Sequence, residues 1–353
     1  MNRYKRQVSS SKGKYEIKCL SLSELWNELP SESFWFIDQN VYQHWASIIP
    51  PSANYKVLGQ SEESKNFNAY QKCLEWLFDQ KASRSASIVA LGGGATLDLA
   101  GFVAATYKRG ISYHSIPTTL LAQVDASVGG KVGINFGRAK NQVGAFWTPE
   151  KILLVPDFLS TLSDREFRSG VAEILKHALV QDPRLLETLK QKPFQRNSSC
   201  LLDHILRSIE IKIKIVEADE FEKNGLRSIL NYGHTIGHAL EMLCYPDLLH
   251  GEAVSIGMYQ ETILAYHLGF CSWFVVEEVK ESLRVQGLPF AMPKNIDLEE
   301  MIEFFDHDKK REGKELTFSL LVEPGKCKLY KNISKEEVLQ IFSKDHHLRH
   351  SQS

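Results

Sequence analysis

Short apolar runs alternate with helical stretches along the first 150 residues, and this alternation limits the possible folds more than any other feature of the sequence. The apolar runs are rich in β-branched and aromatic residues and end in turn residues, which is typical of buried strands. Strands that alternate with helices form a parallel sheet with helices on both faces. The sequence therefore predicts an α/β domain over residues 1–150, with strands at 34–37, 55–58, 87–91 and 111–116 and helices at 67–78 and 98–106.

Beyond residue 150 helical periodicity replaces the strand pattern. The exception is a predicted hairpin, formed by residues 316–322 and 327–331 around a Pro324-Gly325 turn. We expect a second, all-α domain over residues 151–353, with helices at 164–192, 200–220, 234–244, 250–268 and 274–286.

Three consecutive glycines, Gly92, Gly93 and Gly94, connect an expected strand to an expected helix. Glycines at such a turn let the backbone approach a pyrophosphate, and the helix N-terminus offers unpaired N–H donors. The run does not match GxGxxG, so a simple tight turn is an equal alternative. Asp38 ends another expected strand, where a carboxylate accepts from ribose hydroxyls or caps a helix. A nucleotide site and an ordinary turn both fit these residues.

Cationic and polar side chains are interleaved with turn glycines between residues 109 and 141. Glycine-rich turns present such groups to a phosphate or carboxylate, although solvated loop lysines give the same composition. The Pro117-Thr118-Thr119 turn and Asp125 favour a binding cluster, because surface loops require neither of them. The cluster comprises Arg109, Lys131, Lys140 and Asn141.

Histidines and a glutamate stand at helical spacings in the second half. Glu173 shares a helix face with Lys176 and His177, and His234 shares one with His238. These residue types suit Zn²⁺ or a similar divalent ion. From spacing alone the ligand pair is His234 and His238, with satisfied structural histidines as the alternative. Residue 235 is Thr, so the HExxH motif of zinc proteases is absent.

The balance of charges and the cysteines limit the class of protein. The chain has 42 Lys and Arg against 43 Asp and Glu, which argues against a nucleic-acid or membrane-surface binder but allows a small anionic substrate. No apolar run approaches the roughly 18 residues of a transmembrane helix. The six cysteines form no CxxC pair, as is usual in a reducing cytosol. We expect a cytoplasmic protein with no membrane or nucleic-acid partner.

Several long motifs closely resemble those of the 3-dehydroquinate synthase family, which belongs to the sugar phosphate cyclases. They follow in order from about Asp38 to Lys310 and read LGGGATLDLAGFVAATYKRG, IPTTLLAQVDASVGGKVGIN, KNQVGAF, FLSTLSDREFRSGVAEILKH, DEFEKNGLRSILNYGHTIGHALE, LHGEAV and DHDKK. The resemblance implies a Rossmann-like α/β N-terminal domain, an all-α C-terminal domain and an active site between them. The chain departs from the family at Leu97, where a glycine is usual, and at Gly137-Arg138, where a proline is common.

The resemblance also implies roles for individual residues. A zinc or cobalt ion would be held by Glu173, His234 and His250, which leaves His238 as a proton shuttle beside the substrate. Arg109 would reach the site of a partner subunit, so a homodimer is implied. NAD would contact Asp38, Asn40, Glu62, Lys65, Gly92, Gly93, Gly94, Asp98, Thr118, Thr119, Lys131, Lys140, Phe158 and Thr161. The substrate would contact Arg109, Asp125, Lys131, Asn141, Lys176, Lys212, Arg227, Asn231, His238 and either Lys309 or Lys310.

The implied reaction converts 3-deoxy-D-arabino-heptulosonate 7-phosphate into 3-dehydroquinate and phosphate, in the shikimate pathway. It is an NAD- and metal-dependent lyase reaction in which the hydride is returned. The rivals are cyclases acting on sedoheptulose 7-phosphate or glucose 6-phosphate, and a metal-dependent polyol dehydrogenase. A degenerate homologue kept for binding would have lost some residues of the implied site, but Glu173, Lys176, His234 and His250 are all present.

Overall fold

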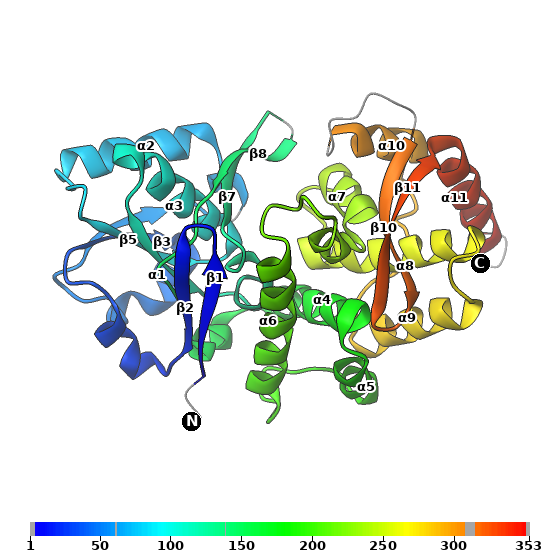
Figure 1. The fold of residues 1–353 in the computed structure, drawn as a ribbon, viewed down its shortest axis with the longest axis horizontal. Helices are drawn as coiled ribbons and strands as arrows, with labels where there is room; N and C mark the ends of the chain where they lie inside the picture. The colour runs from blue at the N-terminus through cyan, green and yellow to red at the C-terminus, as the bar shows by residue number, and fades with distance from the viewer. Residues whose placement is uncertain (1–3, 61, 138, 308–314, 351–353) are drawn as a thin grey trace. The chain divides into compact units, whose positions relative to one another are not determined.

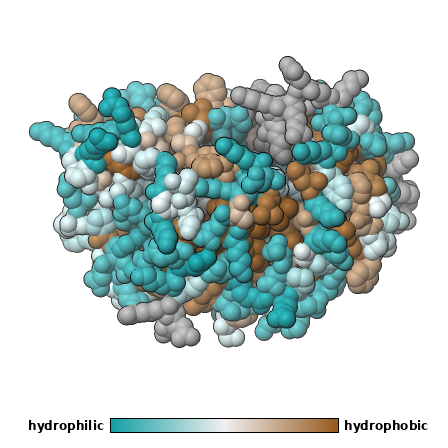
Figure 2. Space-filling model, in the orientation of Figure 1, coloured by the Kyte–Doolittle hydropathy of each residue, from teal (hydrophilic) through white to brown (hydrophobic). Residues whose placement is uncertain are grey.

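The computed structural model describes residues 4–60, 62–137, 139–307 and 315–350. It divides the chain into two compact units, Met1–Ser163 and Asp164–Ser353. Polar side chains cover much of the face in Figure 2, with apolar patches between them. Among the described residues, no helix has both the length and the apolar character needed to cross a bilayer.

Unit 1 is built on a seven-stranded sheet in the order β1-β2-β9-β6-β5-β3-β4. Its neighbouring strands run parallel, except that β1 and β2 form an antiparallel hairpin at one edge. The strands are β1 (Lys5–Ser10), β2 (Gly13–Cys19), β3 (Ser33–Asp38), β4 (Asn54–Leu58), β5 (Ser87–Gly92), β6 (Ser112–Pro117) and β9 (Lys151–Leu154).

Both faces of this sheet are buried, because successive side chains of a strand point to opposite sides. On β3, Phe34 and Phe36 join the core beneath α2 (Phe67–Asp79) and α3 (Gly94–Thr106). Trp35 and Ile37 join a second core, to which α1 (Gln39–Trp45) contributes Val41. Figure 1 shows α2 and α3 side by side. The predicted α/β domain, with both faces of its sheet covered, is confirmed.

The predicted domain boundary at residue 150 is wrong, because it would cut β9 from its sheet. This short strand pairs with β2 and β6 and is followed by the 3₁₀ segment Pro156–Thr161, which belongs to unit 1. A further two-stranded ribbon, β7 (Lys131–Phe136) and β8 (Ala139–Phe146), packs on α3. The pairing of distant segments leaves no local signal in the sequence.

Unit 2 is largely helical, as predicted, with the β10–β11 hairpin also where it was expected. The predicted helix over residues 164–192 is two helices, because Asp182 caps a new helix that begins at Pro183. Its helices are α4 (Asp164–Gln181), α5 (Pro183–Gln191), α6 (Leu201–Ala218), α7 (His234–Leu243), α8 (His250–His267), α9 (Trp273–Val285), α10 (Leu298–His307) and α11 (Lys335–His350), and the hairpin strands are β10 (Glu315–Glu323) and β11 (Lys326–Ser334).

Helix α8 is the central element of unit 2. It is buried on all sides over most of its length and packs against α4, α7, α9 and β10 (Figure 1). Helices α7 and α8 approach so closely that a Cβ added at Gly257 would overlap the carbonyl oxygen of Gly233. This crossing brings the first turns of α7 and α8 near one another.

Candidate functional site

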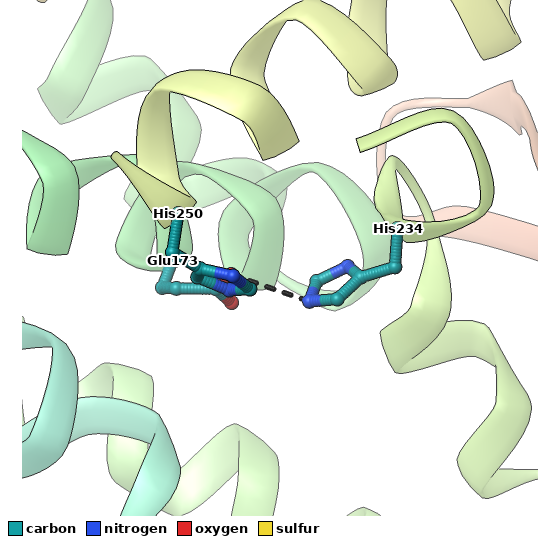
Figure 3. A group of neighbouring side chains, drawn as sticks. All are labelled: Glu173, His234 and His250. Carbon is teal, nitrogen blue, oxygen red and sulfur yellow. Dashed lines mark ion pairs between the residues drawn. The ribbon is translucent and has the colours of Figure 1, made fainter. Parts of the chain in front are cut away.

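Three side chains converge at the beginnings of α7 and α8. His234 is the first residue of α7, His250 is the first residue of α8, and Glu173 lies within α4. The Nε2 atoms of both histidines lie 3.5 Å from Oε1 of Glu173, whose side chain is fully buried (Figure 3). Two ligands bound at 2.0–2.2 Å to a tetrahedral ion lie about 3.3–3.6 Å apart. The spacing therefore fits a divalent metal ion held by all three residues.

The hydrogen bonds of the two imidazoles orient Nε2 toward the glutamate. Nδ1 of His234 lies 3.2 Å from the carbonyl oxygen of Tyr232, and Nδ1 of His250 lies 3.1 Å from Oε2 of Glu241. A proton on Nδ1 leaves the Nε2 lone pair for a metal, as in the carboxylate–histidine–metal arrangement of many enzymes. Glu241 was not singled out from the sequence, although its place three residues after His238 could have suggested it.

The surroundings shift the pKa values of the two histidines in opposite directions. Burial, together with the positive charge of Lys176, lowers the pKa of His234 well below its ordinary range. Burial also lowers the pKa of His250, but Glu241 and Glu173 raise it, and the net result is a pKa of about 10. Because a metal binds the neutral imidazole, its binding must displace a proton from His250.

His238 lies beside this group without joining it. Its ring centroid is 5.1 Å from that of His234 and 5.9 Å from that of His250. A second possible ligand group consists of His238, Glu241 and His250, but there Glu241 already accepts from His250. Spacing alone paired His234 with His238, whereas the structure groups His234 with His250 and Glu173.

The two residues after His250 fix its position. A Cβ at Gly251 would overlap the carbonyl oxygen of Ser169, and the N–H of Gly251 donates to Ser169 Oγ at 2.9 Å. Glu252 accepts from the N–H of Leu249 at 2.9 Å and from Arg165 through both of its carboxylate oxygens. These contacts hold the first turn of α8 against α4 and so fix the position of His250, the residue just before them.

We expect Gly251→Ala to lower the stability of unit 2 by about 1–3 kcal/mol or more, because the new methyl group meets backbone. It should also weaken metal binding by displacing His250, which thermal melts and metal titration would measure. The control Ser169→Ala removes only the accepting hydroxyl and should cost about 1 kcal/mol. Equal effects of the two changes would contradict this account.

Three of the predicted substrate contacts in unit 2 are buried cations, and one of them, Lys176, contacts Glu173. Nζ of Lys176 lies 2.5 Å from Oε2 of Glu173, and the two side chains are only 1% and 0% exposed. Lys212 and Arg227 are also buried, and Asn231 is half-buried. Asp219 holds the loop before Arg227 by accepting from three backbone N–H groups, those of Lys223, Asn224 and Arg227 itself. The predicted contact at Lys309 or Lys310 lies outside the described residues.

In unit 1 the glycine turn begins a helix, as predicted. Gly93 is the N-cap of α3, which starts at Gly94, so the first backbone N–H groups of the helix face the turn. The carbonyl of Gly92 accepts from the N–H of Thr118 at 3.0 Å, which links the turn to the end of β6. Leu97, where the family usually has glycine, is 3% exposed and packs in the core under α2 and α3.

Asp38 stands beside this turn and also caps a helix. Its Oδ1 accepts from the N–H of Asn40 at 2.8 Å, and its Oδ2 accepts from Thr96 Oγ1 at 3.4 Å. Thr96 belongs to the first turn of α3, so the carboxylate and the glycine turn are neighbours. Asp38 therefore does cap a helix, one of the two roles that the sequence left open, and it does so next to the glycine turn.

A cluster of hydrogen-bonded polar side chains in unit 1 contains both predicted NAD contacts and a predicted substrate contact. Nζ of Lys65 donates to Asp98 Oδ2 at 2.5 Å and to Oδ1 of Asn141. Asn135, which the sequence reasoning missed, donates to Glu62 Oε1 at 2.8 Å and accepts from the N–H of Asn141 at 3.0 Å. No local pattern marks Asn135, because its partner Glu62 lies 73 residues earlier in the chain.

The remaining predicted residues of unit 1 are placed individually. Phe158 is buried against Trp45, whose indole N–H donates to Thr161 Oγ1 at 3.1 Å. Thr119 Oγ1 accepts from the N–H of Ala122, and Thr118 is buried. Arg109 is exposed with a left-handed φ of 66°, Asn40 and Lys131 are exposed, and Lys140 and Asp125 are half-buried.

Two family models match this chain, one its N-terminal part and the other most of its C-terminal part. The family model described as 3-dehydroquinate synthase N-terminal matches residues 55–169, and the one described as 3-dehydroquinate synthase C-terminal matches residues 170–311. A 3-dehydroquinate synthase of Caldanaerobacter subterraneus is 41% identical over 88% of this chain and 90% of its own length. One of Dictyoglomus turgidum is 38% identical over 93% of this chain and 92% of its own length.

Similar solved structures include enzymes with bound cofactors. The 2-epi-5-epi-valiolone synthase ValA of Streptomyces hygroscopicus, with NAD⁺ and Zn²⁺ bound, is 25% identical, has a TM-score of 0.86 and covers 98% of this chain and 99% of its own. A 2-deoxy-scyllo-inosose synthase, 24% identical with a TM-score of 0.84, covers 96% of this chain and 99% of its own and shares the fold. Because both family models match and the relatives align over most of their length, the chain belongs to the 3-dehydroquinate synthase family.

Proposed function

We propose that this protein converts 3-deoxy-D-arabino-heptulosonate 7-phosphate into 3-dehydroquinate and phosphate, as an NAD- and metal-dependent lyase of the shikimate pathway. The observation that carries the proposal is the group of Glu173, His234 and His250, with Lys176 beside it. It occurs in a chain about 40% identical to 3-dehydroquinate synthases over most of its length. The cytoplasm is the proposed location, in keeping with the six unpaired cysteines.

The cofactors are assigned to separate units. When bound, NAD⁺ supplies a reversible hydride acceptor, and a zinc or cobalt ion supplies Lewis-acid polarisation of a substrate oxygen. In unit 1 the N–H groups at Gly94 and after it would bind the pyrophosphate, with Asp38 at a ribose. In unit 2 the three converging side chains of Glu173, His234 and His250 would hold the metal.

The buried cations suit an anionic substrate. Lys176, Lys212 and Arg227 lie in low-dielectric surroundings, where each gains more from a phosphate or carboxylate than it would in water. His238, half-buried next to two histidines, would accept and return protons at its imidazole. The other proposed substrate contacts are Arg109, Asp125, Lys131, Asn141, Asn231 and Lys309.

We further propose a homodimer in which Arg109 serves the partner's site. Its support is the family and the exposed side chain of Arg109. Light scattering of the purified protein should give twice the mass of one chain, and Arg109→Ala should lower turnover without weakening metal binding. A monomer with full activity would contradict this part of the proposal.

The test of the activity is an assay on three substrates. Purified protein with NAD⁺ and Zn²⁺ or Co²⁺ should release phosphate from the heptulosonate phosphate and form 3-dehydroquinate without net NADH. Phosphate release only from sedoheptulose 7-phosphate or glucose 6-phosphate would instead assign the chain to another cyclase activity. Accumulation of NADH would indicate a dehydrogenase.

Asn135→Asp tests the link between Glu62 and the cofactor. The new carboxylate keeps the acceptor for Asn141 but faces Glu62 without the donor, which should cost about 1 kcal/mol or more. We expect the Kd of NAD⁺ to rise about fivefold or more, as measured by titration calorimetry. The control Gln71→Glu creates a similar carboxylate pair with Glu75 on the surface of α2 and should leave the Kd unchanged. An unchanged Kd in the Asn135 variant would show that this cluster does not contribute to NAD⁺ binding.

A further inference from the structure

We propose that Glu261 is a positioning residue of the metal centre, which fixes the start of α7 and so the place of His234. This inference rests on the proposed metal-binding role of Glu173, His234 and His250. Glu261 lies in the middle of α8 and its side chain is fully buried. Its Oε2 accepts from the N–H of Gly233 at 2.7 Å, and its Oε1 accepts from the N–H of Ile236 at 3.2 Å.

These two bonds replace an ordinary helix cap. The first N–H groups of a helix have no partner within the helix, and the residue before it usually supplies a side-chain oxygen. At α7 that residue is Gly233, which has no side chain and adopts a left-handed φ of 81°. Glu261 therefore supplies the acceptor from another helix, and its negative charge is favoured by the positive end of the α7 dipole.

His234 lies between the two backbone groups that Glu261 holds. The residue before them, Tyr232, is also anchored to α8, because its hydroxyl donates to the carbonyl of Met258 at 2.9 Å and lies 2.5 Å from Thr262 Oγ1. The carbonyl of Tyr232 in turn lies 3.2 Å from Nδ1 of His234. Hydrogen bonds to α8 thus fix the backbone of His234 through its neighbours, and they fix its ring through Tyr232.

The same helix begins with the second histidine of the centre, His250. Glu261 follows it by about three helical turns. One rigid helix therefore carries His250 directly and holds His234 through Glu261, which sets the separation of the two histidines before any metal binds. The role matches that of outer partners that orient metal ligands, except that Glu261 acts on the backbone rather than on the ring.

The test is Glu261→Gln in the full-length protein, with Co²⁺ as the probe. Gln offers one oxygen, so its amide must face one of the two N–H groups. We expect Co²⁺ to bind about 10–100-fold more weakly and its visible absorption bands to change, because a displaced His234 alters the ligand geometry. The affinity for NAD⁺ should stay at the wild-type value, since the proposed NAD⁺ contacts lie in unit 1.

A matched control separates positioning from a general loss of stability. Asp182 caps α5 by accepting from the N–H groups of Arg184 at 3.1 Å and Leu185 at 3.0 Å. Asp182→Asn keeps an acceptor oxygen for this cap but loses the ion pair with Arg207 at 2.8 Å, so it should lower the melting temperature and leave the Co²⁺ affinity and spectrum as in the wild type. If Glu261→Gln behaves like this control, the inference is wrong.

Two further outcomes remain distinguishable. A wild-type protein that binds no Co²⁺ would overturn the proposed metal centre itself. If Glu261→Gln does not fold, hydrogen exchange of the metal-free wild type decides the matter. The amides of Gly233 and Ile236 should then be protected before metal is added, whereas protection that appears only with Co²⁺ would show that the metal, not Glu261, orders this segment.

Discussion

His250→Ala is expected to abolish tight metal binding and, with it, turnover. The change removes one of three converging ligands and leaves Glu173 and His234, whose donor atoms lie 3.5 Å apart. Loss of a partner outside the ligand set, as in Glu241→Gln, should weaken the metal about 10–100-fold, and loss of the ligand itself should exceed this. Titration with Zn²⁺ against a chelator would rank the two variants.

His238→Ala is the control for this experiment, because His238 lies beside the centre without belonging to the Glu173 group. It should keep the metal and lower kcat by roughly 10²–10⁴-fold, the usual contribution of a general acid or base. Should His238→Ala lose the metal while His250→Ala keeps it, the pair suggested by helical spacing would be the true ligands.

Lys176→Met is expected to destabilise the metal-free protein strongly. It leaves Glu173 fully buried without the ammonium group now 2.5 Å away, and breaking a buried pair in this way costs about 3–5 kcal/mol. For a unit of this size the melting temperature should fall by roughly 6–20 °C. Zn²⁺ should restore most of this loss, because the bound ion supplies the missing positive charge and stabilises the folded state by mass action.

Activity should not return with the stability, because Lys176 is also a proposed substrate contact. Lys190→Met is the matched control: its pair with Glu278 at 2.7 Å is partly exposed and should contribute no more than about 1 kcal/mol. A metal-free Lys176→Met protein that melts like the wild type, or one that Zn²⁺ fails to stabilise, would contradict the assignment of Glu173 as a shared partner of lysine and metal.

Much of the fold could be predicted from the sequence, since the signals for its elements are local. The strands β3, β4, β5 and β6 and the helices α6 to α9 follow from periodicity and turn residues. Strands β1, β2 and β9 were missed, because charged residues interrupt the first two and β9 is short. Their place in the sheet depends on pairing between segments far apart in the chain.

The candidate site divides in the same way. Local patterns alone predict that a glycine turn begins a helix, that Asp38 ends a strand, and that histidines and a glutamate occur at helical spacing. Spacing could not predict which histidine faces Glu173, because an interval of four residues places His234 and His238 on one helix face but says nothing of α4 or α8. The crossing of α7 over α8 at Gly257, the acceptor that Glu241 gives His250 and the cap that Glu261 gives α7 all join residues of different segments or helices. Such contacts arise from packing, which a one-dimensional pattern does not encode.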